Sequence, residues 1–478
     1  LKNYLLVGFG IFILGVASYF YLPKSVQVFD DKFRDLMFVF RGSETPSKDV
    51  VIIDIDERSL KELGQWPWSR NKFAQLIDNL TKSGVGAVGL DIVFAEPDNS
   101  SPAKVLKEIG KDATGAPDYD KIAAEAIGAS PTILGYVFAM SDDGVKPGVA
   151  PSISCIVAEK NKPEHEFLVH AHRAIMNIPV IQEAGFSSGF FNTIPDSDGI
   201  VRSIPMVIRY DGVVYPSLSL EMVRAASGAK KIEVYYDEVG VKGLVVGNIE
   251  MPTDRFGRLL VNYKGPARTF KYISAVDVYS GKIGKAELEG KFALIGTSAA
   301  GLSDLRATPF DSVYPGVEAH ANALDNILNQ NFLYRPSWAE GANVIIIFLG
   351  VAITVLVTSY ASAGASLALF VVLVSSFFGF TYYMLFFKGV VLNILFPTLS
   401  MFLTFVSLTL TNYFLENRQK KFIKAKFAKK VSPAVVEDLL KHSNMNSFEI
   451  KEKFVTIFFS DIRGFTTLSE VMGSPKAR

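Results

Sequence analysis

The sequence predicts a multi-domain membrane protein that carries a large α/β domain on one side of the membrane. Three observations predict it. Long uncharged apolar runs occur near the start and again in the last third of the chain. Strand-like and helix-like patterns alternate between them. A basic cluster follows the last apolar run. The 478 residues suffice for two or three domains.

Composition supports a membrane protein and limits the kinds of partner that the chain would bind. Hydrophobic residues make up 49% of the chain and the mean hydropathy is +0.25, which is high for a soluble protein. The formal net charge of +1 does not point to nucleic acid. Cys155 is the single cysteine, so no intramolecular disulfide framework is possible. A domain outside the cell must therefore be held together by its core.

The first apolar run covers residues 4–22. As a helix it would span about 28 Å, close to the roughly 30 Å of a hydrocarbon core. A signal peptide is the alternative, but it would end at a small-x-small cleavage site. This run ends on Tyr19, Phe20 and Tyr21, as at a membrane interface. We therefore expect residues 1–23 to form an uncleaved anchor.

Three further apolar runs, at 342–359, 361–387 and 390–414, follow closely on one another. They are too long and too free of charge to read as buried core helices, so we expect residues 342–414 to form three membrane spans. Arg418 and six lysines follow them, with Glu416 as the one acid. The positive-inside rule places this stretch in the cytoplasm. A surface for anionic lipid or nucleic acid is the alternative.

Four spans put both termini inside an inner or plasma membrane and residues 24–340 outside it. Within this outer segment we expect an α/β domain with a largely parallel sheet. Strands are predicted at 50–56, 85–94, 132–138, 201–210, 259–263 and 292–296, helices at 70–82, 118–129 and 315–330, and a loop at 139–162.

Three acids, Asp54, Asp56 and Asp91, lie at or near strand ends of this predicted sheet. Crevices of open α/β sheets form beyond the carboxyl ends of the strands. A ligand or cation site there is one interpretation, and we weigh it against the more common roles of such acids in helix caps and turns.

Two tryptophans and one histidine favour structural roles. Trp66 and Trp68 flank a proline before a helix and should pack as a corner, rather than stack on a ligand. His320 lies near Glu318 on a predicted helix, and we favour a satisfied structural histidine over metal binding or pH sensing. No Cys/His cluster has zinc-ligand spacing.

Several strings in the outer segment resemble the extracellular sensor domain called CHASE, type two. They are I-D-I-D at 53–56, L-G-Q-W-P-W-S-R at 63–70, G-L-D-I-V-F at 89–94, D-S-D-G-I-V-R at 196–202, A-L-I-G-T-S at 293–298 and Y-P-G-V-E-A-H-A-N at 314–322. The resemblance implies a sensor over residues 24–340, followed by three membrane spans and a cytoplasmic output domain. It implies no particular ligand.

After the last span, residues 415–450 predict a helical cytoplasmic linker. One helix should run on from the span over 417–442, and Ser432-Pro433 supplies an N-cap and a first-turn proline for a second stretch at 434–441. The linker suits a dimerising signal helix, with an ordinary connector as the alternative.

The end of the chain, from residue 454, carries the pattern that points to chemistry. A buried strand is predicted at 455–459, ending at Asp461, with a turn and then a helix from Phe465. The carboxylate of Asp461 can hold Mg²⁺. The amides of Gly464, Phe465 and Thr466 can point at phosphate oxygens. Response-regulator and phosphatase-like folds also use such a unit.

The string F-V-T-I-F-F-S-D-I-R-G-F-T-T-L-S-E at 454–470, with V-S-P-A-V-V-E-D-L-L at 431–440 before it, resembles the first strand and helix of a class III adenylate or guanylate cyclase domain, which would cover residues 451–478 here. The resemblance implies that Asp461 is the first metal-binding aspartate and that the Ile462 carbonyl is a second ligand. Gly464, Phe465 and Thr466 would contact the phosphates. Two Mg²⁺ ions are implied, with Mn²⁺ as a possible substitute.

The family's reaction is attack of the ribose 3′-hydroxyl on the α-phosphorus of a nucleoside triphosphate, with release of pyrophosphate. The resemblance therefore implies an adenylate cyclase using ATP (or GTP), assembled as a homodimer and answering an extracytoplasmic signal. The remaining catalytic residues would lie beyond Arg478. We therefore expect a truncated cyclase domain that holds no complete catalytic set and is inactive by itself.

A different class of output is also open. The alternative is a membrane sensor with a non-catalytic, cyclase-like dimerisation module. Asp461 favours the enzyme. A linked kinase is disfavoured because the C-terminal string matches no kinase motif, and the outer segment shows no nucleophile–base pair with recognisable spacing.

Overall fold

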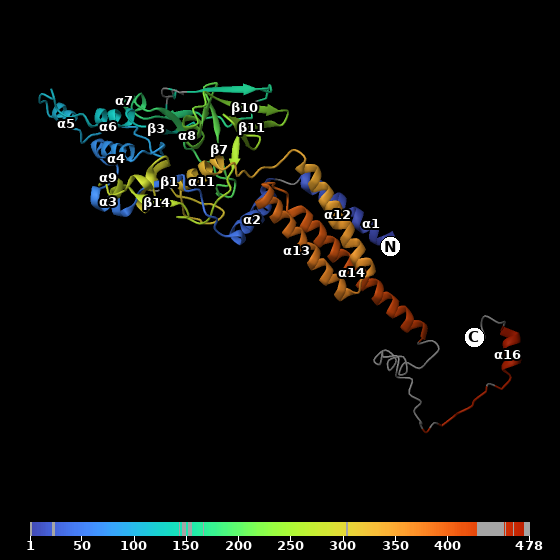
Figure 1. Cartoon of the computed structure of the whole chain (residues 1–478). Coiled ribbons are helices and arrows are strands. Elements are labelled where there is room, and N and C mark those ends of the chain that lie inside the picture. Colours follow the sequence, from blue (N-terminus) through green and yellow to red (C-terminus); the bar gives the residue numbers. More distant parts are fainter. Residues whose placement is uncertain are drawn as a thin grey trace. The chain divides into compact units, whose positions relative to one another are not determined.

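The computed structural model describes residues 2–21, 24–142, 144–145, 150–151, 155–165, 167–302, 305–427, 454, 456–461 and 463–472. The chain divides into two compact units, residues 1–409 and 410–478. The first unit contains an α/β domain and a helical bundle (Figure 1). In the second unit, the described elements are the end of α14 (Leu395–Phe427) and α16 (Phe465–Met472).

The α/β domain is built on a seven-stranded sheet in the order β14-β1-β15-β2-β3-β5, with β6 also paired to β3. All neighbours are parallel except β3 and β5. The largely parallel sheet predicted from sequence is therefore confirmed. The strands are β1 (Val50–Ile55), β2 (Ala87–Leu90), β3 (Thr132–Ala139), β5 (Arg173–Ile175), β6 (Ser187–Phe190), β14 (Lys271–Ser274) and β15 (Phe292–Thr297).

Both faces of this sheet are covered, and β1 shows how. Val51 and Ile53 pack into one core cluster, while Val50 and Ile52 pack into another. Successive side chains of a strand point to opposite faces, so a strand buried on both faces reads as a continuous apolar run. The first cluster lies under α4 (Arg70–Lys82), α6 (Tyr119–Gly128) and α9 (Ala275–Tyr279), and the second under α8 (Leu218–Ala226) and α11 (Gly316–Leu328).

A second sheet, in the order β12-β11-β10-β4, was not predicted. Its strands are β4 (Ile156–Lys160), β10 (Lys231–Asp237), β11 (Gly240–Val246) and β12 (Ile249–Pro252). The predicted loop at 139–162 is wrong where β4 lies, because β4 is held by parallel pairing with β10 and has no buried face of its own. The predicted strand at 201–210 is split into two strands that pair with different partners.

The remaining elements are short. The paired strands are β7 (Ser203–Pro205) with β13 (Arg258–Leu260), β8 (Val207–Tyr210) with β9 (Val213–Pro216), and β16 (Leu305–Arg306) with β17 (Tyr314–Pro315). The helices are α3 (Glu57–Leu63), α5 (Pro102–Glu108), α7 (Pro179–Gln182), α10 (Lys285–Leu288) and the 3₁₀ turn Ala300–Leu302.

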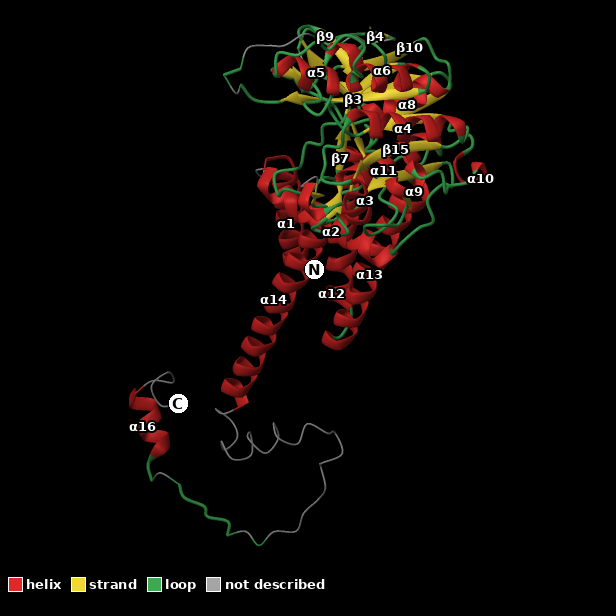
Figure 2. Ribbon diagram, turned by 90° about the vertical axis from the view of Figure 1, so that its left-hand side faces the viewer, coloured by secondary structure: helices red, strands yellow, loops and turns green. Residues whose placement is uncertain are grey.

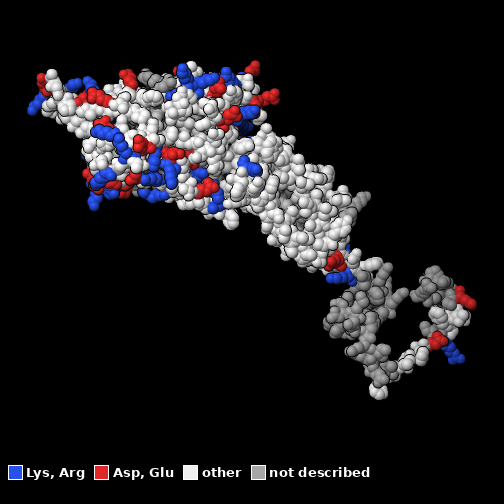
Figure 3. Space-filling view, viewed as in Figure 1, with Lys and Arg blue, Asp and Glu red and all other residues white. Residues whose placement is uncertain are grey.

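Among the described residues, four helices are long and apolar enough to cross a membrane: α1 (Lys2–Tyr21), α12 (Ala339–Tyr360), α13 (Ala363–Lys388) and α14. In Figure 2 the strands gather in the α/β domain and the helices form a separate bundle. In Figure 3, charged side chains are spread over the α/β domain, whereas most of the bundle surface carries no charged side chain. Gly8 and Gly15 of α1 lie so close to α12 and α14 that an added Cβ would overlap Val355 and Ser400.

The last of these helices begins at Leu395, so the predicted start at Val390 is wrong. Gly389 ends α13 in a left-handed conformation (φ 67°). The chain then runs extended, because the Val391 amide donates to Tyr334 O at 2.9 Å and the Tyr334 amide donates to Gly389 O at 2.8 Å. These bonds take the place of a first helical turn.

Helix α2 (Lys24–Arg41) stands between α1 and β1 and was also not predicted. It packs on both parts of the first unit. Phe38 contacts Phe310 of the α/β domain and Phe386 of α13, with ring centroids 6.0 and 5.2 Å apart. Helix α2 is therefore one element through which the domain and the bundle share contacts.

Candidate functional site

The segment predicted to bind nucleotide is described in part. Gly464 has φ +82°, in the left-handed region that favours glycine, and α16 begins at Phe465. The predicted turn and helix are therefore present, with the amides of Gly464, Phe465 and Thr466 where that helix starts. Ile462 lies outside the described residues, as do the predicted second linker stretch at 434–441 and the end of the first.

The predicted buried strand before this turn is wrong for the residues described. Residues 456–461 have no regular secondary structure, and Phe458 and Phe459 are 84% and 90% exposed. A strand needs a neighbour to take its hydrogen bonds, and no described strand pairs with this segment. Asp461 is a suitable hard oxygen donor for Mg²⁺. It is one ligand and not a set, since no group of three His, Cys, Asp or Glu side chains in the described ranges could hold a metal.

The acids at the strand ends have structural partners. Asp56 caps α3 by accepting from the Ser59 amide at 2.8 Å, as a helix-cap role requires. Asp54 accepts from Ser298 N and Oγ at 3.0 and 2.6 Å. Burial raises the pKa of Asp54. Asp91 is buried, and its amide donates to Ile295 O. The carboxylates of Asp54 and Asp56 thus tie the strand ends to neighbouring segments.

The aromatic corner and the histidine also lie as the structural interpretation predicts. Trp66 and Trp68 meet edge to face at 5.3 Å, and Trp68 Nε1 donates to Gly64 O at 2.8 Å. His320 is buried and lies 2.9 Å from Phe191 O through Nε2. The contacts of these three side chains are explained by their place in the fold.

Arg202 is the centre of the strongest polar contact between α2 and the α/β domain. Its side chain is 3% exposed. Nε and Nη2 donate to both oxygens of Asp35 on α2, at 2.8 and 2.7 Å. Nη1 and Nη2 donate to both oxygens of Asp198, at 2.9 and 2.8 Å, and Nη1 also reaches Asp196 at 3.0 Å. One guanidinium therefore binds three carboxylates.

The hydrogen bonds from Arg202 also affect the ionisation of the acids in the loop in which Arg202 lies. Hydrogen bonds from Arg202 hold the pKa of Asp198 well below its usual range, and Lys32 of α2 adds an ion pair at 3.1 Å. Both acids of the D-S-D-G-I-V-R string thus serve the arginine of the same string. Charge-assisted paired bonds of this kind are strong and directional. They fix the angle at which α2 meets the domain.

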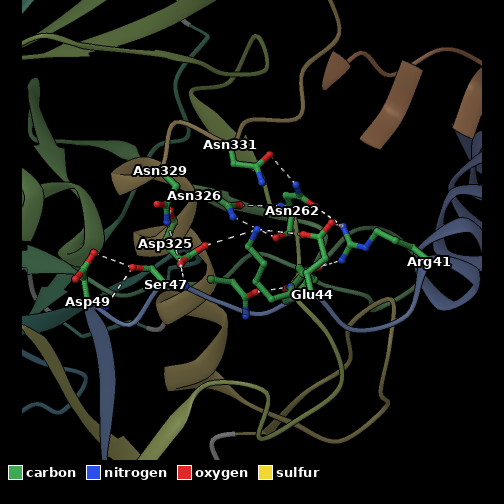
Figure 4. Close-up of polar contacts among 12 residues, drawn as sticks. Arg41, Glu44, Ser47, Asp49, Asn262, Asp325, Asn326, Asn329 and Asn331 are labelled. Atoms are coloured by element: carbon green, nitrogen blue, oxygen red, sulfur yellow. Dashed lines mark hydrogen bonds and ion pairs between the residues drawn. The ribbon is translucent and has the colours of Figure 1, made fainter. Parts of the chain in front are cut away.

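A second polar cluster joins the end of α2 to α11 (Figure 4). Arg41 donates from Nη1 to Asn262 Oδ1 at 2.7 Å and from Nη2 to Tyr263 O. The Asn262 amide in turn donates to Asn326 Oδ1 of α11 at 2.8 Å. Asp325 of α11 accepts from the Ser47 amide at 2.8 Å, and burial raises its pKa. Ser47 is therefore bonded to α11 directly, and Arg41 reaches α11 through Asn262.

The opposite end of α2 is bonded to the bundle. Asp30 is 3% exposed and accepts from the amides of Ile394 and Leu395 at 2.7 and 2.9 Å. These amides belong to the start of α14, whose first groups have no partner within the helix. Asn393 accepts from the Phe396 amide at 3.0 Å. A negative charge at a helix N-terminus is also favoured by the helix dipole.

Helix α2 is thus the candidate coupling site. One end of this single helix is bonded to the first turn of α14, and its middle and other end are bonded to the α/β domain. A rigid helix with fixed bonds at both ends can transmit a displacement. Sequence reasoning missed this site, although the string that holds Arg202 was noticed. The amphipathic spacing of 24–41 was the available signal.

Removing the Asp30 carboxylate should expose the start of α14 to exchange with solvent. In an Asp30→Ala chain, the amides of Ile394 and Leu395 lose their acceptor, which costs about 1–3 kcal/mol. We expect hydrogen exchange of the peptide containing residues 394–396 to become roughly tenfold faster or more. Asp31→Ala is the matched control, because Asp31 pairs with Arg34 on its own helix. Equal exchange in wild type and Asp30→Ala would contradict the cap.

Comparison with known proteins gives one family. The family model described as CHASE2 domain matches residues 9–356, which include most of α1, all of α2 and the α/β domain, and most of α12. No curated protein matches the chain, and no solved structure matches it.

Proposed function

Because this chain belongs to the CHASE2 domain family, we propose that it is a transmembrane receptor that couples an extracytoplasmic signal to cyclic-nucleotide synthesis in the cytoplasm. CHASE2 is an extracellular sensor domain, and in the part of the chain that the structure describes four helices are long and apolar enough to span a membrane. In the proposed topology the chain crosses an inner or plasma membrane four times, with the sensor outside and both ends inside.

The observation that carries this proposal is the bonding of α2 to the start of α14. Asp30 caps the helix that leads away from the sensor, while Asp35 and Arg41 bind the sensor itself. A signal that moves the Arg202 loop or α11 would therefore act on α14 through α2. The basic residues at the far end of α14, from Arg418 to Lys426, favour a cytoplasmic location for that end.

The proposed output is formation of cyclic AMP from ATP, with GTP as the alternative substrate. Asp461 would hold the metal ion, and the amides of Gly464, Phe465 and Thr466 would bind phosphate oxygens at the start of α16. Bound Mg²⁺ would neutralise charge on the phosphates. The left-handed Gly464 allows the backbone to approach a phosphate closely. Two copies of the chain would form the functional unit.

The test has two arms, run on the complete protein in cell membranes. A membrane-impermeant maleimide should label Lys61→Cys from outside and Lys420→Cys only after the membrane is opened, since both side chains are exposed in the structure. The membranes should convert ATP with Mg²⁺ into cyclic AMP, read by mass spectrometry. Correct labelling without a cyclic nucleotide from ATP or GTP would favour the non-catalytic dimerisation output instead.

A further inference from the structure

Helix α2 presents an uncharged apolar stripe along one face. Phe29, Phe33, Leu36 and Phe40 recur at the spacing i, i+4, i+7, i+11, which places them on one side of a helix. Phe29 and Leu36 are each 62% exposed and Phe40 is 83% exposed. The side chains are large, so this is a continuous apolar surface and not a scattered residue.

The charged residues of the same helix from Asp30 to Arg41 each have a partner within the first unit. Asp30 binds the start of α14, Asp35 binds Arg202, and Arg41 binds Asn262. The remaining pairs are Asp31 with Arg34 and Lys32 with Asp198. A helix that faced water would carry charge on its outer face. Here the stripe itself carries none between Phe29 and Phe40, and Lys32 at its edge, which is half exposed, pairs with Asp198.

The stripe is continuous with α13, one of the helices that can span a membrane. Phe33 lies 6.1 Å from Phe378, and Phe40 lies 6.0 Å from Tyr382, both as ring-centroid distances. Phe33 also lines an apolar groove of about 230 Å³ between α2, α13 and α14, together with Phe370, Leu395 and Phe402. The hydroxyl of Thr398 in this groove donates to Ile394 O at 2.7 Å. The groove therefore needs no polar partner.

We propose that α2 is a membrane-surface helix whose apolar stripe and adjoining groove bind the acyl chains of phospholipids in the leaflet that the sensor faces. An amphipathic helix of this kind buries its apolar face at the boundary of headgroups and acyl chains. Acyl chains suit the surface because they offer no hydrogen bonds and the surface requires none. The stripe adjoins the exposed apolar side chains of α13, so one lipid environment covers both.

This inference rests on the proposed membrane topology and extends it. Lipid on the outer face of α2 and the Asp30 and Asp35 contacts on its inner face make α2 sensitive to the bilayer as well as to the sensor. The phospholipid is thereby a partner of the coupling helix itself. A second copy of the chain would be the competing occupant of the stripe.

The test is spin-label accessibility on the complete protein in phosphatidylcholine–phosphatidylglycerol nanodiscs. Single cysteines replace Leu36, Phe40 or the groove residue Leu399. Val372→Cys on the exposed face of α13 is the lipid control, and Val239→Cys in the β10–β11 turn is the water control. The wild-type chain gives the background, because Cys155 is buried. Oxygen reports acyl chains, and a water-soluble nickel chelate reports water.

We expect Leu36→Cys, Phe40→Cys and Leu399→Cys to resemble Val372→Cys, with nickel collision rates at least about fivefold below that of Val239→Cys. Nickel access at positions 36 and 40 while position 372 stays lipid-like would overturn this inference and leave the spans standing. Dipolar broadening between labels at position 40 would assign the stripe to a second copy, and also overturn it. Nickel access at position 372 would remove the spans and the inference together.

Discussion

Replacement of Arg202 by methionine is expected to lower the free energy of unfolding of the sensor by about 3–5 kcal/mol. Methionine fills part of the space but leaves Asp35, Asp196 and Asp198 around it without the cation that they share. Removing one partner of a buried ionic group leaves uncompensated charge, which costs more than the pair contributes. For a domain of this size the unfolding midpoint should fall on the order of 10 °C.

The measurement is thermal unfolding of the complete protein in nanodiscs, followed by tryptophan fluorescence. Arg202→Lys should fall between wild type and Arg202→Met, because an ammonium group cannot form paired bonds with two carboxylates. Arg58→Met is the matched control. Arg58 lies on the surface with Glu62 and Asp277, where an ion pair contributes little. An Arg202→Met chain as stable as wild type would show that the three acids do not depend on this arginine.

Acid pH provides an independent check of the same contact. The bonds from Arg202 depress the pKa of Asp198 in the folded sensor. A depressed pKa contributes stability that is present above the unfolded value of about 3.9 and is lost as the pH falls toward the folded value. Arg202→Met lacks this contribution. The difference in stability between the two chains should therefore shrink below about pH 4.

Elements whose pattern is local could be predicted from the sequence. Helix α4 spans Arg70–Lys82 as predicted, because its buried side chains recur at helical spacing and Ser69 precedes it. Strand β1 begins with the apolar run Val50–Ile53, whose side chains are covered on both faces. Four long apolar stretches also indicate membrane helices from the sequence alone, without tertiary information.

Elements that depend on distant partners could not be predicted in the same way. Asp30 caps an amide 364 residues away, so neither end of that bond reveals the other. Strand β4 does not alternate between buried and exposed positions. It forms because it pairs with β10. The late start of α14 follows from bonds to Tyr334. By contrast, β10 has a clear period of two and was open to prediction.

The candidate coupling site combines both kinds of information. The D-S-D-G-I-V-R string was visible as a motif, but its role required the position of Asp35 on a helix that the sequence analysis did not expect. A sequence motif indicates which side chains act together, and the fold shows which element they bind. Here they hold the helix that is bonded to both the sensor and the start of α14.

Replacement of Asp461 by alanine in the complete protein is expected to reduce cyclic-nucleotide formation by at least about 100-fold. Under the proposed function, this carboxylate would hold the ion that offsets the charge of the phosphates, a contribution of several kcal/mol to the reaction. A loss of about 2.7 kcal/mol corresponds to 100-fold in rate. The measurement is cyclic AMP and cyclic GMP production by membranes that contain equal amounts of each protein.

Glu470→Ala is the matched control, because Glu470 is an exposed carboxylate on α16 a few residues further along the chain. It should retain wild-type activity, so that a general effect of removing a negative charge near this helix is separated from loss of a ligand. Hydrogen exchange of the sensor should be the same in all three proteins. Full activity in Asp461→Ala would remove Asp461 from the active site, since no other carboxylate among residues 456–461 could replace it. Loss of activity in both variants would instead attribute the effect to the helix.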